Sequence, residues 1–235
     1  MASRSCLRYS QRRLPEALEL ADQAMELLAV PQGRLAVQIL MTRAQVYSAQ
    51  GLAERALPDL FAAAEALGTN TDVFLLWLVR QNLASGLWRL GRIEEAESWL
   101  GQARVLAAEL AQRAPWYHTL WLEGLIADHK IRLEVAAIQL REVCMGFRGS
   151  GSWGHFAVAA LDLARIEARR GCVDEAIVWA VQALPHLQAL ELESEGLAAL
   201  ALVREQVAAK QLRAAVLEPL RRAAGRAVGA PELQG

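Results

Sequence analysis

The stretch GRIEEAESWLGQA, residues 91–103, places two alanines, Ala96 and Ala103, seven positions apart after a glycine. Seven residues are close to two turns of an α-helix, so both alanines lie on one face. A glycine opens a similar phrase forty residues earlier and eighty residues later, and between them the chain has Ile131 at the corresponding position. The sequence therefore predicts a repeat with a period of forty residues.

Three columns of small residues keep this register over four copies. One column lies before each turn and two lie after it. Paired helices approach closely only where their side chains are small, so the columns indicate where two helices of a pair cross. The columns are Ala44, Ala84, Gly124 and Ala164; Ala56, Ala96, Ala136 and Ala176; and Ala63, Ala103, Val143 and Ala183.

Local signals indicate where helices begin and end. The turn glycines can adopt the left-handed conformation that ends a helix. Thr71 or Asp72 can cap a long helix that runs to about Leu90, and Pro115 suits the first turn of the next helix. No segment alternates apolar and polar residues as a half-buried strand does, so the predicted fold class is all-α.

The spacing of Ala84, Gly91, Ala96 and Ala103 resembles that of the tetratricopeptide repeat (TPR) family. The usual unit of that family has about 34 residues, so we expect longer helices and connections here. The resemblance covers about residues 12–226 and implies a right-handed α-solenoid of about five antiparallel helix pairs. A HEAT-like helical array, with a period of about forty or more, is the alternative, but the glycine and alanine columns favour a TPR-like array.

We expect four parts along the chain: a partial N-terminal repeat at 1–30, four TPR-like repeats at 34–190, a degenerate C-terminal helix pair at 191–227 and a flexible tail at 228–235. Residues 14–28 read as a second helix that lacks a full first-helix partner. An uncovered end would expose apolar surface, so we expect either a piece of a longer protein or a homo-oligomer formed through this end. A short capping helix at 3–12 is the alternative.

The composition excludes several classes of protein. The chain has 235 residues, of which 54% are hydrophobic, and a formal net charge of −1, as in an ordinary core-forming protein. A near-neutral charge argues against direct nucleic-acid binding. The apolar run at 73–79 is too short to span a membrane, and no secretory signal is visible. Cys6, Cys144 and Cys172 lack a CxxC spacing, which suits reduced thiols and a cytoplasmic location.

The sequence offers no constellation of residues for catalysis. GSGSWG, residues 149–154, matches the dinucleotide-binding pattern GxGxxG, but that chemistry needs a strand before the glycines. The preceding residues continue a helical copy, so we interpret the match as a connection between repeats. The four histidines show no spacing typical of zinc ligands. We therefore expect no cofactor, no metal and no enzymatic activity.

The TPR resemblance also implies a binding groove, because the first helices of such arrays line the concave face. Counting from Ala84 places a mixture of Trp, Asn, Gln and Arg there, which is typical of recognition surfaces. Asn82 stands where peptide-binding members commonly hold the ligand backbone. Asp128 and Asp162 fall on the same face. The candidate groove residues are Gln45, Gln81, Asn82, Ser85, Trp88, Arg89, His118, Trp121, Arg165 and Arg169.

These patterns favour a non-catalytic scaffold that binds a protein or peptide partner on the concave face. Two further hypotheses belong to other classes of protein. The chain can be a sensor or oligomerisation domain of a larger bacterial transcription regulator, because such regulators often carry arrays with repeats near forty residues. A catalytic α-helical domain is the third, and the absence of converging catalytic residues argues against it.

Overall fold

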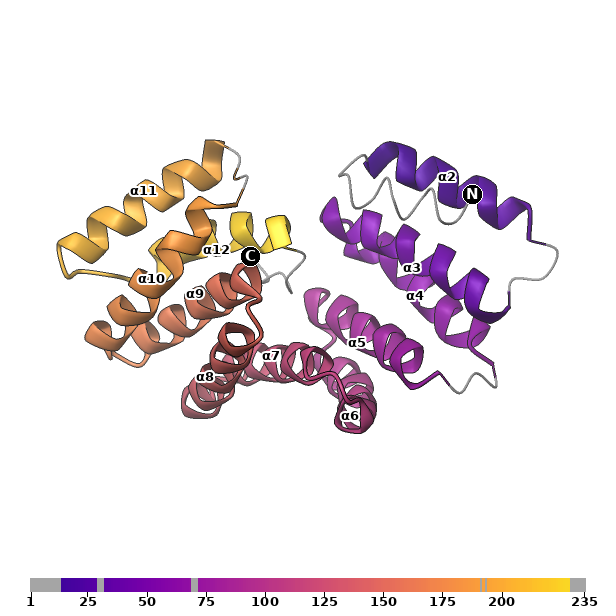
Figure 1. Cartoon of the computed structure of the whole chain (residues 1–235), viewed down its shortest axis with the longest axis horizontal. Helices are drawn as coiled ribbons and strands as arrows, with labels where there is room; N and C mark the ends of the chain where they lie inside the picture. Colours follow the sequence, from indigo (N-terminus) through magenta and orange to yellow (C-terminus); the bar gives the residue numbers. More distant parts are fainter. Residues whose placement is uncertain (1–13, 29–31, 69–71, 191, 193, 229–235) are drawn as a thin grey trace. The chain divides into compact units, whose positions relative to one another are not determined.

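The computed structural model describes residues 14–28, 32–68, 72–190, 192 and 194–228. Every regular element in these ranges is an α-helix, which confirms the all-α prediction (Figure 1). The chain divides into two compact units, Met1–Ala111 (unit 1) and Gln112–Gly235 (unit 2). The division falls within the predicted repeat region 34–190. None of the described helices is long and apolar enough to cross a membrane.

The described part of unit 1 consists of one helix followed by two helix hairpins. Each helix packs against the next one along the chain, and α4 packs against α5 as well as against its hairpin partner. The helices are α2 (Leu14–Glu26), α3 (Gly33–Ala49), α4 (Ala53–Ala66), α5 (Val73–Arg89) and α6 (Ile93–Glu109). Helix α2 confirms the helix predicted at the N-terminal end, whereas the capping segment proposed for 3–12 lies outside the described residues.

Unit 2 begins with two further hairpins, but its last two described helices do not continue the regular stack. Helix α8 packs against α9 as in a regular stack, but the last helix, α12, packs against α9 and α11. The helices are α7 (Ala114–His129), α8 (Leu133–Gly149), α9 (Trp153–Arg169), α10 (Val173–Gln188), α11 (Ser194–Ala208) and α12 (Ala214–Val228). Helices α11 and α12 lie in the segment 191–227 and pack against each other, and α12 also returns to α9 of the preceding hairpin (Figure 1).

The three columns of small residues are buried where the hairpin helices cross. Ala84, Ala96 and Ala103, one from each column, have no exposed surface, and the remaining members of the three columns are also buried. A methyl group built on Gly124 would lie 3.1 Å from Cγ of Leu140 on the facing helix, so the column residue must be small there. The predicted spacing thus marks real helix contacts.

The turns within the hairpins follow the predicted glycine rule. Gly51, Gly91 and Gly171 have φ values of 74°, 72° and 81°, in the left-handed region that glycine adopts without strain. Ile131, which replaces the glycine in the third hairpin, has φ of 60° and keeps the same turn. The first helices of the four hairpins are therefore α3, α5, α7 and α9, as the register predicts.

Two predicted helix starts are also confirmed. The carboxylate of Asp72 accepts a hydrogen bond from the backbone N–H of Leu75, at 3.1 Å, and so caps α5. Pro115 lies in the first turn of α7, where its missing N–H has no helical partner to lose. Thr71, the alternative cap, lies outside the described residues.

Candidate partner-binding face

The candidate groove residues of unit 1 lie on the first helices α3 and α5. Gln45 of α3 is half-buried, as are Asn82, Ser85 and Arg89 of α5. Gln81 and Trp88 are buried, with 7% and 3% of their surfaces exposed. The side-chain amide of Asn82 donates a hydrogen bond to the carbonyl of Leu78, one turn earlier, at 2.8 Å. The α5 face therefore combines accessible polar groups with a buried indole.

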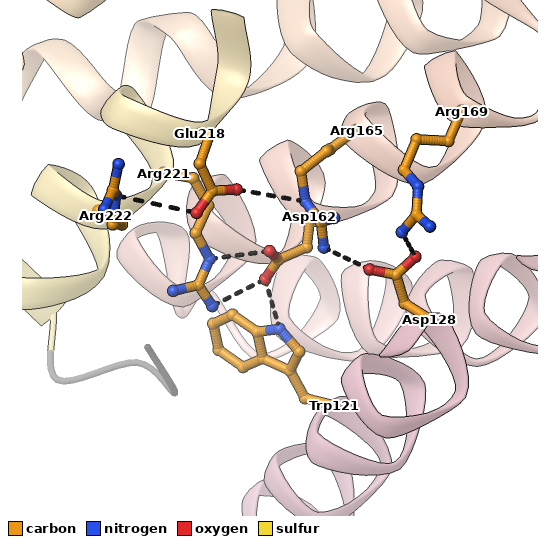
Figure 2. A network of polar contacts seen from close by, with 8 residues as sticks. All are labelled: Trp121, Asp128, Asp162, Arg165, Arg169, Glu218, Arg221 and Arg222. Carbon is orange, nitrogen blue, oxygen red and sulfur yellow. Dashed lines mark hydrogen bonds and ion pairs between the residues drawn. The ribbon is translucent and has the colours of Figure 1, made fainter. Parts of the chain in front are cut away.

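The candidate residues of unit 2 lie on α7 and α9, and three of the four belong to one polar network. Figure 2 shows Trp121, Arg165 and Arg169 around two carboxylates, Asp128 and Asp162. The fourth, His118, lies in a neighbouring aromatic cluster. Trp121 is completely buried and Arg165 is 9% exposed. Two predicted contact residues are thus engaged inside unit 2.

The centre of the network is Asp162 of α9. Its two carboxylate oxygens accept hydrogen bonds from Nε and Nη2 of Arg221 in α12, at 2.8 and 2.9 Å. The indole Nε1 of Trp121 donates a third bond, also at 2.8 Å. Neither Asp162 nor Arg221 has any exposed surface. The paired geometry is the strong, directional form of an arginine–carboxylate contact.

Arg221 is held on two sides. Its guanidinium carbon lies 6.0 Å from the centroid of the Trp121 ring, close enough for a cation–π contribution. Nη1 of Arg221 is buried and has no hydrogen-bond partner among the described residues. The side chain is therefore fixed by one carboxylate and one ring, and one of its donor atoms is left unsatisfied.

A second set of charges borders this centre. Asp128 of α7 pairs with Arg165 at 2.8 Å and also with Arg169 (Figure 2). Nε of Arg165 lies 3.7 Å from a carboxylate oxygen of Glu218 on α12, and Glu218 also lies 3.8 Å from Arg222. Burial raises the pKa of Glu218, and the nearby arginines oppose this shift. Helix α12 thus contributes both an anion and a cation to the α9 face.

An aromatic cluster adjoins the network. The rings of His118, Trp121, Phe147 and His155 lie within 6.4 Å of one another, centroid to centroid. Burial, together with the neighbouring His155, lowers the pKa of His118 to about 4. Burial also lowers the pKa of His155, although a hydrogen bond with the backbone of Val228 opposes this. The end of α12 therefore rests beside a histidine that burial favours in its neutral form.

The remaining sequence motifs have structural positions. GSGSWG spans the last residue of α8, the turn in which Gly151 has φ of 72°, and the first two residues of α9, so the interpretation as a connection between two helical copies is confirmed. Cys144 is buried, which raises the pKa of its thiol. Within the described ranges, no three His, Cys, Asp or Glu side chains are grouped to hold a metal ion.

The register predicts that Asp128 and Asp162 lie on this face, but it does not predict that Glu218 and Arg221 of α12 pack against it. Glu218 and Arg221 lie in the segment expected to form an ordinary terminal helix pair. One signal was available: Arg204 stands forty residues after Ala164, where the column requires a small residue. The missing small residue indicates that the regular stack ends before α11. Helix α12 then packs against α9 and does not extend the stack.

No protein-family model, curated protein or solved structure matches this chain.

Proposed function

We propose that the chain is a TPR-like right-handed α-solenoid that binds a partner protein or peptide on the faces of its first helices, without catalysis. The observation that supports the proposal most directly is the packing of α12 against α9. There the face of a first helix holds an amphipathic helix through Asp162 and Arg165, in addition to apolar contacts. A face that recognises one helix in this way has the chemistry to recognise a segment of another protein.

The repeat register supports the same function for unit 1. Asp162 lies eighty residues, or two repeats, after Asn82. The TPR resemblance assigns the Asn82 position to the ligand, and in unit 2 the equivalent residue contacts a docked helix. The amide of Asn82 can both donate and accept hydrogen bonds, so it suits the backbone of an extended or helical segment.

Photo-crosslinking of the full chain in the cells that produce it tests this proposal. A photoreactive amino acid replaces Ser85 on α5 in one variant and Val105 on α6 in the other. Val105 is 62% exposed, so it is a fair control for accessibility. We expect a discrete covalent adduct with another protein from position 85 and none from position 105. Absence of an adduct at position 85, or equal adducts at both positions, would overturn the proposal.

A second variant separates recognition from folding. Asn82→Ala combined with Arg89→Ala removes two polar groups from the α5 face, and both side chains are only half-buried. We expect the adduct at position 85 to fall by about ten-fold, because such residues can dominate an interface. Far-UV circular dichroism of the variant should match that of the parent. An undiminished adduct would show that α5 is not the contacting face.

A further inference from the structure

Helix α12 occupies the α9 face although chain order does not require it there. Unit 2 stacks regularly up to α10, and then α11 makes few contacts with α10 and packs chiefly on α12. A turn at Lys210, with φ of 53°, reverses the chain between α11 and α12. The contacts that the side chains of α12 make with α9 therefore determine the position of α12.

On its own, α12 is a poor helix. It has 15 residues, which is marginal for an isolated helix in water, and it contains Pro219 and Gly225 in its interior. Proline removes a backbone hydrogen bond and glycine adds flexibility to the unfolded state. The helical form of α12 therefore depends on its docking, as for a segment that folds on binding.

The contact between α12 and α9 also has a different centre from the crossings of the hairpin helices. The hairpins cross at buried alanines, whereas α12 buries an ion pair, Arg221 with Asp162, beside the apolar Leu217, Leu220 and Ala224. A buried ion pair adds little net stability over an apolar contact of the same shape, but an incorrect partner leaves a charge uncompensated. The buried ion pair thus contributes more to the choice of the helix that binds α9 than to the strength of its binding.

We propose that the α9 face of unit 2 is a binding site for an arginine-bearing amphipathic helix of a partner protein, and that α12 occupies it as an internal ligand until that helix replaces it. The partner helix carries an arginine that reaches between Asp162 and Trp121, and an acidic residue one turn earlier that faces Arg165, as Arg221 and Glu218 do. The inference deepens the proposed function and rests on it.

The test cuts the chain between α11 and α12 without removing α12. A specific protease site is inserted between Lys210 and Gln211, both of which are exposed, and the folded full chain is then cut. Cutting matters because a tethered helix has a high effective concentration that a free peptide does not easily overcome. A fluorescent peptide with residues 211–228 is added, and its exchange into the cut chain is followed by anisotropy.

We expect the cut fragment to stay bound after cleavage and to exchange with the labelled peptide while the remaining chain keeps its helical circular dichroism. A peptide with Arg221→Met should bind about 100-fold more weakly, because it leaves Asp162 without its cation. The matched control is a peptide with Arg222→Met. Arg222 is exposed, and its ion pair with Glu218 is long, at 3.8 Å, so the affinity of this peptide should change by about three-fold or less. The substitutions are made in the peptide, so the folding of the chain is not at issue.

Three results would overturn the inference. The fragment could exchange only when unit 2 unfolds, which would make α12 a permanent part of the core. The Arg221→Met peptide could bind as tightly as the native one. The uncut chain could sediment as a dimer that Arg221→Met in the chain converts into a monomer with unchanged helical circular dichroism, which would identify a second copy of the chain as the occupant. Failure of the proposed function is distinguishable, because the crosslink at Ser85 does not involve α12.

Discussion

Helices α5 and α9 hold the same place in the repeat, two copies apart, and their faces carry different chemistry. Asn82, Ser85 and Arg89 on α5 correspond to Asp162, Arg165 and Arg169 on α9. On α9 all three side chains form ion pairs, and those of Asp162 and Arg165 reach residues of α12. On α5 the amide of Asn82 donates to its own helix. At these three positions the α5 face therefore carries one cation, whereas the α9 face carries one anion and two cations and is occupied by α12.

A second contrast concerns the ion pairs that hold each unit together. In unit 1, Arg43 of α3 binds Asp59 of α4 and Asp22 of α2, so it ties consecutive helices. Its hydrogen bond to Asp59 raises the pKa of the Arg43 guanidinium. In unit 2, Arg221 ties α12 to α9, which is far away in the sequence. Similar chemistry thus supports a local stack in one unit and a long-range docking in the other.

Removing the two arginines should give the largest difference. Arg221→Met strands the buried Asp162 carboxylate, so we expect the free energy of unfolding of unit 2 to fall by about 3–5 kcal/mol. Arg43→Met should cost unit 1 only about 1–3 kcal/mol, because the Arg43 side chain is 25% exposed and water can replace part of its contact. Urea denaturation followed by circular dichroism and hydrogen exchange would measure both. Equal losses would contradict the contrast between a buried and a partly solvated pair.

A double variant sharpens this result. Asp162→Leu combined with Arg221→Met replaces the buried pair by apolar side chains. We expect it to be more stable than Arg221→Met alone, because no unpaired charge remains. Additive losses would mean that the two residues act independently.

Acid should weaken unit 2 and spare unit 1, since all four histidines of the sequence lie in unit 2. The pKa of His118 is lowered in the folded chain to about 4, from an ordinary value of 6.5. Between these values the unfolded chain binds a proton that the folded chain does not. The free energy of unfolding of unit 2 should therefore be highest above pH 6.5, and it should fall by about 2–3 kcal/mol as the pH is lowered towards 4.

Hydrogen exchange of α7–α9 against α3–α5 over this pH range would measure the difference. His118→Phe should remove most of the dependence on pH, because the phenyl ring keeps the apolar contacts and cannot take a proton. The same pH dependence in the variant would contradict the role assigned to His118.

The small columns should respond alike in both units, because they belong to the shared scaffold. Ala96→Leu in unit 1 and Ala176→Leu in unit 2 insert a large side chain at positions with no exposed surface. Each should lower stability by about 1–3 kcal/mol through overpacking. Ala53→Leu, at a half-buried position outside the columns, is the control. Melting temperatures of the two column variants that match the control would refute the register.

The smallest expected effect concerns the turns. Ile131 is the only turn residue among the four hairpins that is not glycine, and it has φ of 60° and 74% exposure. A β-branched residue is strained in this conformation, so Ile131→Gly should raise the melting temperature, by the equivalent of about 1 kcal/mol. The reverse change, Gly91→Ile in unit 1, should lower it. No change in either variant would contradict a common turn geometry.

The repeating part of the fold could be predicted because its signals are local. Turn glycines, alanine spacing and the Asp72 cap each act within one helix pair, so the register alone predicts α3 to α10 and places Asp162 on the α9 face, where it contacts α12. The docking of α12 could not be read in this way. It depends on an ion pair between residues 59 positions apart, and Arg221 in the sequence resembles any charge on an amphipathic helix. Arg204 indicated only that the stack ends.

The most direct test of the account asks whether α12 lies on α9 in solution. A Cβ atom built on Gly154 lies 3.7 Å from Cβ of Val228, within the range that a disulfide requires. Under mild oxidation, Gly154→Cys with Val228→Cys should form one intramolecular disulfide in nearly all molecules, identified by peptide mapping. Gly154→Cys with Arg226→Cys is the control, because Arg226 is exposed on α12. A yield no higher than in the control would contradict the docking of α12 on which the proposed binding face depends.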